Sequence, residues 1–310
     1  LFTLLLAALG TLPPFSIDMA LPALSQIAAT LASSVGTVTL TLSFFMAGFS
    51  LAQLVFGPLA DRYGRRPTLL AGCALFTLAS LACALANSIE VLLLARFVEG
   101  CGAGAGMVMV FAIVRDLFVG PQIRTKLSYV TLVLNVAPMI APLIGAAVLG
   151  VGDWRAIYAT LGLGGALLTL AVYAGLGESL ARPDPEALQP ARLLGNYRHV
   201  LGHREAGAYI LINALSFGCM FAYVSGSSFV MMQLYGLSAG AYGLAFAATA
   251  GSILLGSLLS GKLGERHVSE HIPLQLGLDQ PVASALALCL LVLYSAPSLP
   301  VFLGLCVICT

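Results

Sequence analysis

The chain has 310 residues, of which 59% are hydrophobic and 9% are charged, and its mean hydropathy is +0.99. This composition excludes an ordinary soluble domain and is typical of a polytopic membrane protein. The near balance of 14 basic and 13 acidic residues gives no reason to expect a nucleic-acid partner.

Apolar stretches follow one another along the chain, and about 20 such residues suffice to cross a bilayer as a helix. The predicted spans are residues 1–24, 36–58, 68–87, 89–112, 127–150, 154–176, 207–233, 239–261, 272–295 and 298–310. The long polar segment 177–206 contains three prolines and is predicted to be a linker with a short amphipathic helix. The expected domains are a first transmembrane bundle (1–176), the linker (177–206) and a partial second bundle (207–310) of about four helices.

Basic residues are distributed unevenly among the predicted loops. Twelve lie in the loops that follow even-numbered spans, whereas the alternate loops contain only Arg155. Because cytoplasmic loops carry an excess of Lys and Arg, we predict that the N-terminus and the even-to-odd loops are cytoplasmic.

The junction at residues 57–67 reads Gly-Pro-Leu-Ala-Asp-Arg-Tyr-Gly-Arg-Arg-Pro and separates two uncharged spans. We expect a tight basic loop in which Pro58 and Pro67 mark helix edges and Asp61 pairs with a neighbouring arginine. A basic loop can serve simply to fix topology. That explanation does not account for the glycines and the acid at their positions.

This junction resembles the loop between the second and third helices of the major facilitator superfamily. The match covers Gly57, Leu59, Asp61, Arg62, Gly64, Arg65 and Arg66. The resemblance implies an all-α membrane fold of two pseudo-symmetric six-helix bundles, of which the second is incomplete in this chain. It also implies that this loop, together with Asp116, acts as a conformational switch.

An internal repeat supports two related bundles. Arg62, Gly64 and Arg66 recur 200 residues later as Lys262, Gly264 and Arg266, again after an apolar span. Parallel repeats related by an axis along the membrane normal are the architecture of this superfamily's two halves.

Ionisable residues inside predicted spans are costly and therefore point to function. Asp18 lies in the first span between Pro13-Pro14 and Pro22, which are expected to loosen the helix and expose backbone groups. The alternative is that Asp18 merely ends a short helix at the outer surface. Arg96 and Glu99 lie three residues apart on one helical face, where they either neutralise each other locally or line a central aqueous cavity. Asp279 is embedded if the ninth span starts at residue 272 and lies in a loop if it starts at residue 281. The second start leaves only about 16 apolar residues, so the first is favoured.

Three further motifs resemble the drug:proton antiporters of the bicyclomycin and chloramphenicol resistance group. These motifs are the fourth-helix sequence Arg96-Phe-Val-Glu-Gly100, the first-helix acid Asp18, and an antiporter motif in the fifth helix. The antiporter motif, at residues 141–146, contains Pro142 and Gly145 and has alanine at two positions where glycine is usual; Pro138 lies in the same helix. Two departures put the charge preference of the substrate in doubt: Gly10 replaces a second acid that some members carry, and Glu99 stands where glutamine is usual.

The resemblance implies export of a lipophilic small molecule, such as an antibiotic, from a bacterial cell through the inner membrane in exchange for protons. Asp18 and Glu99 are the candidate proton carriers. The cavity is expected between the two bundles, lined by Asp18, Phe45, Gln53, Arg96, Glu99, Asn135, Met139, Asn213, Phe217, Met220 and Tyr223. The alternatives are proton-coupled uptake of a metabolite and a sensor that binds its ligand without moving it.

The expected partners are the drug-like substrate, protons and the lipid bilayer. No enzyme is expected, because no cluster of nucleophile, base or metal ligands is visible, and no cofactor is expected besides the proton gradient. Two glycine-rich patterns, at 100–105 and 256–262, lack the strand or the hydroxyl that a nucleotide site requires. We predict instead that small residues four apart, Gly100/Gly104 and Gly102/Gly106, allow close helix packing.

Overall fold

The computed structural model describes residues 2–265 and 298–309, and within these residues every regular element is a helix. The predicted ninth span at 272–295, with Asp279, and the repeat residue Arg266 lie outside the described residues. Seven helices in the described part are long enough and apolar enough to cross a membrane. One bent pair of helices makes an eighth span if it is counted as one.

The first span is the bent one. It consists of α1 (Phe2–Gly10), α2 (Leu12–Asp18), a short 3-10 helix η1 (Leu21–Ala23) and α3 (Leu24–Thr30). Pro13, Pro14 and Pro22 lack the N–H that an unbroken helix needs, which explains why the helix breaks around them. The span continues to Thr30, six residues beyond the predicted end.

The remaining elements are regular helices. They are α4 (Val35–Tyr63), α5 (Arg65–Ala84), α6 (Ile89–Leu117), α7 (Pro121–Val151), α8 (Trp154–Gly175), α10 (Arg204–Ser228), α11 (Ala239–Glu265) and α13 (Leu299–Cys309). The linker contains α9 (Pro190–Gly202), which agrees with the expected short helix, and α10 continues into a π-helix, η2 (Phe229–Leu234).

The expected loop at 57–67 is wrong in its extent, because α4 continues through Pro58 to Tyr63 and Gly64 alone separates it from α5. Pro58 leaves the carbonyl of Leu54 without its helical donor. The hydroxyl of Tyr197, on α9, donates to that carbonyl at 2.8 Å and so compensates for the missing bond.

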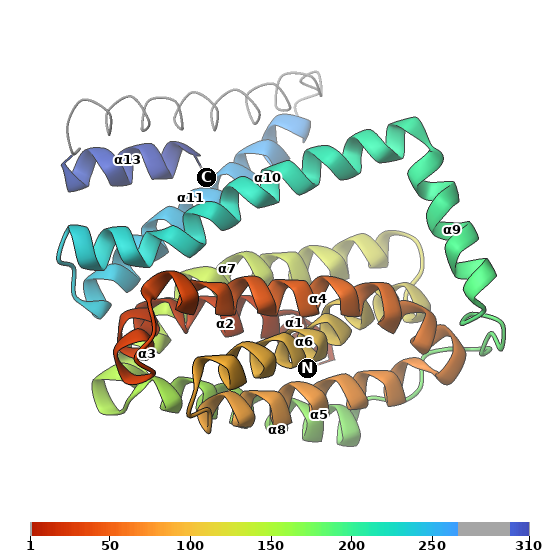
Figure 1. The fold of residues 1–310 in the computed structure, drawn as a ribbon. Helices are drawn as coiled ribbons and strands as arrows, with labels where there is room; N and C mark the ends of the chain where they lie inside the picture. Colours follow the sequence, from red (N-terminus) through yellow and green to blue (C-terminus); the bar gives the residue numbers. More distant parts are fainter. Residues whose placement is uncertain (1, 266–297, 310) are drawn as a thin grey trace.

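Small residues bring α6 into close contact with three neighbours, as predicted. A Cβ at Gly100 would collide with the carbonyl of Phe45 on α4, and one at Gly102 would collide with the backbone of Phe76 on α5. A Cβ at Gly106 would meet the α1 carbonyl of Leu9 at 3.0 Å. These approaches place α6 at the centre of the first bundle, which consists of α1–α8 (Figure 1).

We call the end of the first bundle that carries Gly64 and Gly120 the basic end, and the end that carries the α3–α4 and α7–α8 connections the far end. Helices α10 and α11 meet the first bundle through η1 and α7. Figure 1 shows α10 diverging from α4 toward the basic end, where α9 crosses to the first bundle. Apart from Ala206 and Gly207, residues 204–220 of α10 are exposed. Within the described residues, α10 therefore contacts the first bundle toward the far end and separates from it toward the basic end.

Candidate functional site

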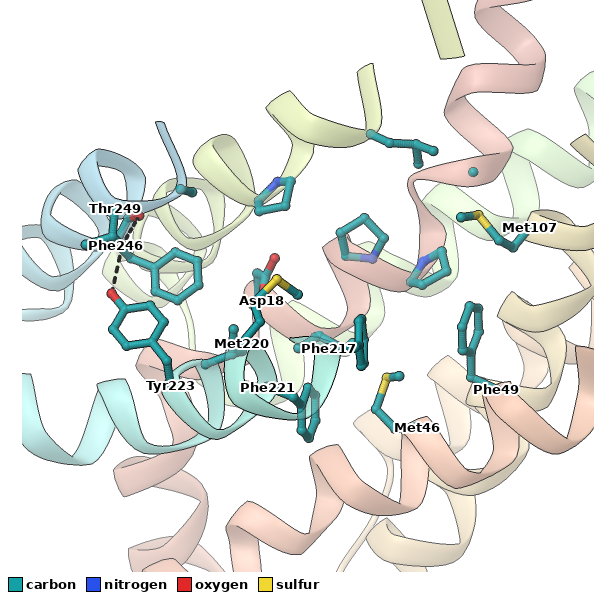
Figure 2. A pocket seen from close by; sticks show the side chains of 18 residues that line it. Asp18, Met46, Phe49, Met107, Phe217, Met220, Phe221, Tyr223, Phe246 and Thr249 are labelled. Carbon is teal, nitrogen blue, oxygen red and sulfur yellow. Dashed lines mark hydrogen bonds between the residues drawn. The ribbon is translucent and has the colours of Figure 1, made fainter. Parts of the chain in front are cut away.

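An apolar cavity of about 260 Å³ lies where the broken first span, α4, α6 and α7 face α10 and α11. Figure 2 shows aromatic and methionine side chains converging on it from both sides. Its lining is Gly10, Pro13, Pro14, Ile17, Asp18, Met46, Phe49, Met107, Leu134, Pro138, Phe217, Met220, Phe221, Tyr223, Val224, Phe246, Thr249 and Ala250. Flexible Met side chains and aromatic rings can adapt to apolar ligands of different shapes.

Among the described residues, Asp18 is the sole carboxylate in that lining, which contains no Lys, Arg or His. It ends α2, where the helix breaks ahead of Pro22, and only 5% of it is exposed. In the described residues no hydrogen bond or ion pair joins its carboxylate to another side chain. The cavity lining also contains the polar side chains of Tyr223 and Thr249, whose hydroxyls lie 2.7 Å apart (Figure 2). Asp18 is thus a carboxylate in apolar surroundings, available to a proton or a ligand.

Arg96 and Glu99 lie elsewhere, in the interior of the first bundle, and both side chains are fully buried. A guanidinium nitrogen of Arg96 donates to Glu99 at 2.7 Å, so the local pair is the arrangement that the structure shows. Ser16 and Ser80 donate to the other carboxylate oxygen at 2.7 and 3.0 Å. Such pairing offsets the large cost of removing two charges from water.

The ring of Phe45 covers Arg96, with the guanidinium carbon 4.5 Å from the ring centre. Tyr158 lies on the same guanidinium at 5.5 Å. Phe45 is therefore part of this buried cluster rather than of the cavity wall, and the same turn of α4 presents Met46 and Phe49 to the cavity instead.

The structure brings four of the eleven expected lining residues together in the apolar cavity: Asp18, Phe217, Met220 and Tyr223. Asn135 lines a separate cavity, Asn213 is exposed on α10, and Gln53 and Met139 are half-buried outside the apolar lining. Phe221 and Phe246 line the cavity but were not among the expected residues. Phe221 could have been predicted from the sequence, because it follows Phe217 by one helical turn. In the structure the two rings stack, with their centroids 6.2 Å apart.

The basic end contains a small ion-pair network. Arg65 donates to Asp61 at 2.6 Å and to Asp116 at 2.9 Å. Asp61 is therefore paired with an arginine, as expected, and Asp116 lies beside that pair. Arg66 donates to the carbonyl of Tyr173 at 2.8 Å. The network therefore joins α4, α5, α6 and α8, all within the first bundle.

Glu178, just after α8, is a contributor to this network that the sequence analysis did not single out. Its carboxylate accepts the backbone N–H groups of Arg65 and Arg66 at 2.9 and 3.2 Å and so caps the first turn of α5. Partial burial raises the pKa of Glu178, but four backbone N–H donors outweigh that effect and hold the pKa below its usual range. Gly64 has φ +103°, and a Cβ there would lie 2.5 Å from this carboxylate.

The far end is closed by hydrogen bonds between the first span and α10–η2. The hydroxyl of Ser228 donates to the carbonyl of Leu21 at 2.6 Å, and the amide of Gln233 donates to Ser25 at 3.0 Å. Gly145 of the expected antiporter motif packs directly on the carbonyl of Met19, where a Cβ would collide. Pro138 lines the cavity one turn beyond Leu134.

Membrane-length helices packed in this way define a multi-pass α-helical membrane protein. The chain belongs to the major facilitator superfamily, whose family model matches residues 6–310. The family and fold expected from the motifs are confirmed.

Relatives of the chain include proteins named for drug resistance. It is 32% identical to a bicyclomycin resistance protein homolog of Haemophilus influenzae, over 84% of this chain and 66% of that protein. It is also 32% identical to a chloramphenicol resistance protein of Pseudomonas aeruginosa, over 97% of this chain and 71% of that protein. The chain thus spans about two thirds of the length of the curated relatives that it matches.

The fold matches solved transporters at low sequence identity. The xylose transporter XylE of Escherichia coli, in a partially occluded inward-open conformation, superposes with a TM-score of 0.77 at 15% identity. That match covers 99% of this chain and 80% of the solved chain. The likeness supports the fold alone.

Proposed function

We propose that the protein exports a lipophilic, drug-like small molecule across a bacterial inner membrane in exchange for protons. The observation that carries this proposal is the apolar cavity with its single carboxylate, Asp18, which has no partner among the described residues. The names of the drug-resistance relatives support the substrate class. The basic end is assigned to the cytoplasm because basic loops are retained there.

In this assignment the structure is the cytoplasm-facing state. A drug enters from the cytoplasm and occupies the apolar cavity, where a charged Asp18 is costly unless water or a ligand compensates it. Drug and proton then compete for the cavity, so that drug binding expels the proton and reprotonation from outside releases the drug. Because linkage is reciprocal, drug affinity rises with pH while this site titrates.

Coupling is assigned to Asp18 rather than to Glu99. Glu99 is fully buried, ion-paired to Arg96 and bonded to two serines, so its proton exchange would leave a buried arginine uncompensated. Asp18 has neither an ion pair nor a hydrogen bond within the described part of the chain.

The network around Arg65 is proposed as the cytoplasmic switch, made of Gly57, Asp61, Arg62, Gly64, Arg65, Arg66 and Asp116. In the present state its ion pairs lie within the first bundle. Contacts of this network with the second bundle would hold the cytoplasmic side closed in the opposite state.

The test is proton-driven accumulation of a fluorescent lipophilic drug in everted membrane vesicles, whose cytoplasmic face is outward. Asp18→Asn should abolish accumulation, whereas Glu90→Gln, which neutralises an exposed acid at the start of α6, should retain it. Full transport by Asp18→Asn would refute the assignment of coupling to Asp18.

Two further measurements separate the alternatives. Drug-induced proton release in detergent should disappear in Asp18→Asn and persist in Glu99→Gln, and the reverse result would move coupling to Glu99. Uptake by right-side-out vesicles driven by an inward proton gradient would indicate an importer. Drug binding without any flux in proteoliposomes would indicate a sensor.

A further inference from the structure

A second cavity, of about 660 Å³, lies between α7 and α11 on the basic side of the apolar cavity. The two cavities adjoin on both helices. On α7, Leu134 lines the apolar cavity and Asn135 lines the second one; on α11, Ala250 lines the first and Leu254, one turn further, lines the second. The second cavity therefore extends the first toward the proposed cytoplasmic mouth.

The α7 wall of the second cavity carries a polar stripe. Arg124, Ser128, Thr131 and Asn135 are spaced by four, three and four residues, which places them on one face of the helix over about 16 Å. The hydroxyl of Ser128 bonds to the carbonyl of Arg124 within the helix. Polar side chains in a membrane helix mark substrate or ion pathways, and this stripe faces a cavity.

The remaining polar groups of the stripe are available to a ligand. In the part of the chain that the structure describes, no hydrogen bond or ion pair joins the side chains of Arg124, Thr131 or Asn135 to another residue. Among the side chains that the structure describes, no acid lines the cavity. The arginine provides a cation and several donors, and the asparagine amide provides two more donors.

We propose that the second cavity is a polar subsite that binds the anionic head group of an amphiphilic substrate while its apolar body occupies the adjoining apolar cavity. This inference rests on the proposed function and specifies its substrate class. The head group binds at Arg124 because guanidinium is suited to carboxylate and phosphate oxygens. The reverse orientation would place an anion beside the carboxylate of Asp18, which repels it.

A basic residue near the end of a membrane helix can also act by fixing topology alone. Lys126 provides a matched control for that explanation, because it lies two residues further along the same helix. Its ammonium group sits over the ring of Phe118 at 5.3 Å, outside the lining of the second cavity. Replacing either residue by glutamine removes one positive charge from the same end of α7.

The experiment measures equilibrium binding of three probes with one apolar body to the purified protein in nanodiscs of zwitterionic lipid. The probes are 8-(1-naphthyl)octanoate, its uncharged amide and 8-(1-naphthyl)octyltrimethylammonium, whose chains of about 10 Å can extend from the apolar cavity toward Arg124. The wild-type protein should bind the acid more tightly than the ammonium probe. Arg124→Gln should weaken acid binding about fivefold, the upper range for a solvent-accessible ion pair, and leave the ammonium probe unchanged. Lys126→Gln should change neither.

A second variant tests the stripe without a change of charge. Thr131→Ala should weaken binding of the acid and the amide, whereas Thr125→Ala, whose hydroxyl bonds only to the carbonyl of Pro121, should not. Acid binding by the wild type should also fall as salt is raised, and that dependence should be absent in Arg124→Gln.

Several results would overturn the subsite. These are equal binding of acid and ammonium by the wild type, equal loss of all probes in Arg124→Gln, or the same effect in Lys126→Gln. Selective binding of the acid without proton-driven flux would refute the proposed function but leave the subsite intact. Proton-driven drug transport together with equal loss of binding of all three probes in Arg124→Gln would refute the subsite but leave the proposed function intact. Adding phosphatidylglycerol to the nanodiscs distinguishes the source of the anion. Competition with the naphthyl acid indicates a membrane lipid, and the absence of competition indicates a soluble amphiphile.

Discussion

The hydrogen bond from Ser228 to the carbonyl of Leu21 closes the far end, and its removal should favour the state that is open there. The two oxygens are 2.6 Å apart, and both residues are buried. Leu21 also accepts the backbone N–H of Leu24, so Ser228→Ala leaves no buried carbonyl without a donor. The expected cost is therefore the net value of one hydrogen bond, about 1 kcal/mol, and not a full desolvation penalty.

A change of about 1 kcal/mol alters the ratio of the two states about fivefold, since 1.36 kcal/mol corresponds to a factor of ten. The assay labels a cysteine at position 46, on the cavity wall, with a membrane-impermeant maleimide added outside intact cells. The seven native cysteines are first replaced. Labelling of Met46→Cys should become about fivefold faster in the Ser228→Ala background.

Ser225→Ala is the matched control, because its hydroxyl donates to the carbonyl of Ala222 within α10 and, among the described residues, makes no hydrogen bond to the first span. It should leave the labelling rate unchanged. An unchanged rate in Ser228→Ala, or an equal increase in Ser225→Ala, would refute the claim that this bond between the first span and α10 stabilises the closed far end.

Two other predictions concern the first bundle. Glu178→Ala should lower the free energy of unfolding by about 1 kcal/mol at pH 7, as for other lost helix caps. Because the folded-state pKa of Glu178 lies below its ordinary 4.5, the contribution of its charge is present above that value and disappears as pH falls through the lowered pKa, so thermal denaturation curves should converge in acid. Arg96→Lys loses the planar group between Phe45 and Tyr158, so efflux should largely stop and stability should fall by about 2 kcal/mol; wild-type efflux and melting would contradict this.

Features encoded by local spacing could be predicted from the sequence. Gly100 and Gly102 lie on opposite faces of one helix, and Gly106 shares a face with Gly102, so close neighbours on more than one side follow from the spacing. The prolines around Asp18 likewise predict a broken helix. Neither inference requires knowledge of which residues distant in the chain come together.

The direction in which a side chain faces could not be predicted where the helix is apolar all round. Arg96 and Glu99 share a face of α6, but no polar stripe identifies that face as cavity or interior. The fully buried pair is stabilised by hydrogen bonds from Ser16 on α2 and Ser80 on α5, and the sequence of α6 does not indicate these partners. For the same reason Met46 could not be preferred over its neighbour Phe45.

Helix capping by residues distant in the chain could not be predicted from the local sequence pattern either. Glu178 caps a helix that begins 113 residues earlier in the chain, and nothing near it in the sequence indicates that partner. Pro58 was expected to end α4 because its missing N–H leaves Leu54 unpaired. The donor that compensates, Tyr197, comes from the linker 143 residues away.

The two ends of the molecule are held by different kinds of contact, and this difference assigns them to different steps. At the far end, hydrogen bonds from Ser228 and Gln233 join the first span to α10–η2, so they must break before that end opens. At the basic end, the ion pairs of Arg65 join helices of the first bundle only, so they do not hold the two bundles together in the present state. Weakening the far-end bonds therefore destabilises the present state itself. Weakening the Arg65 network acts through the opposite state, where closure brings the second bundle against it, and so shifts the equilibrium in the other direction.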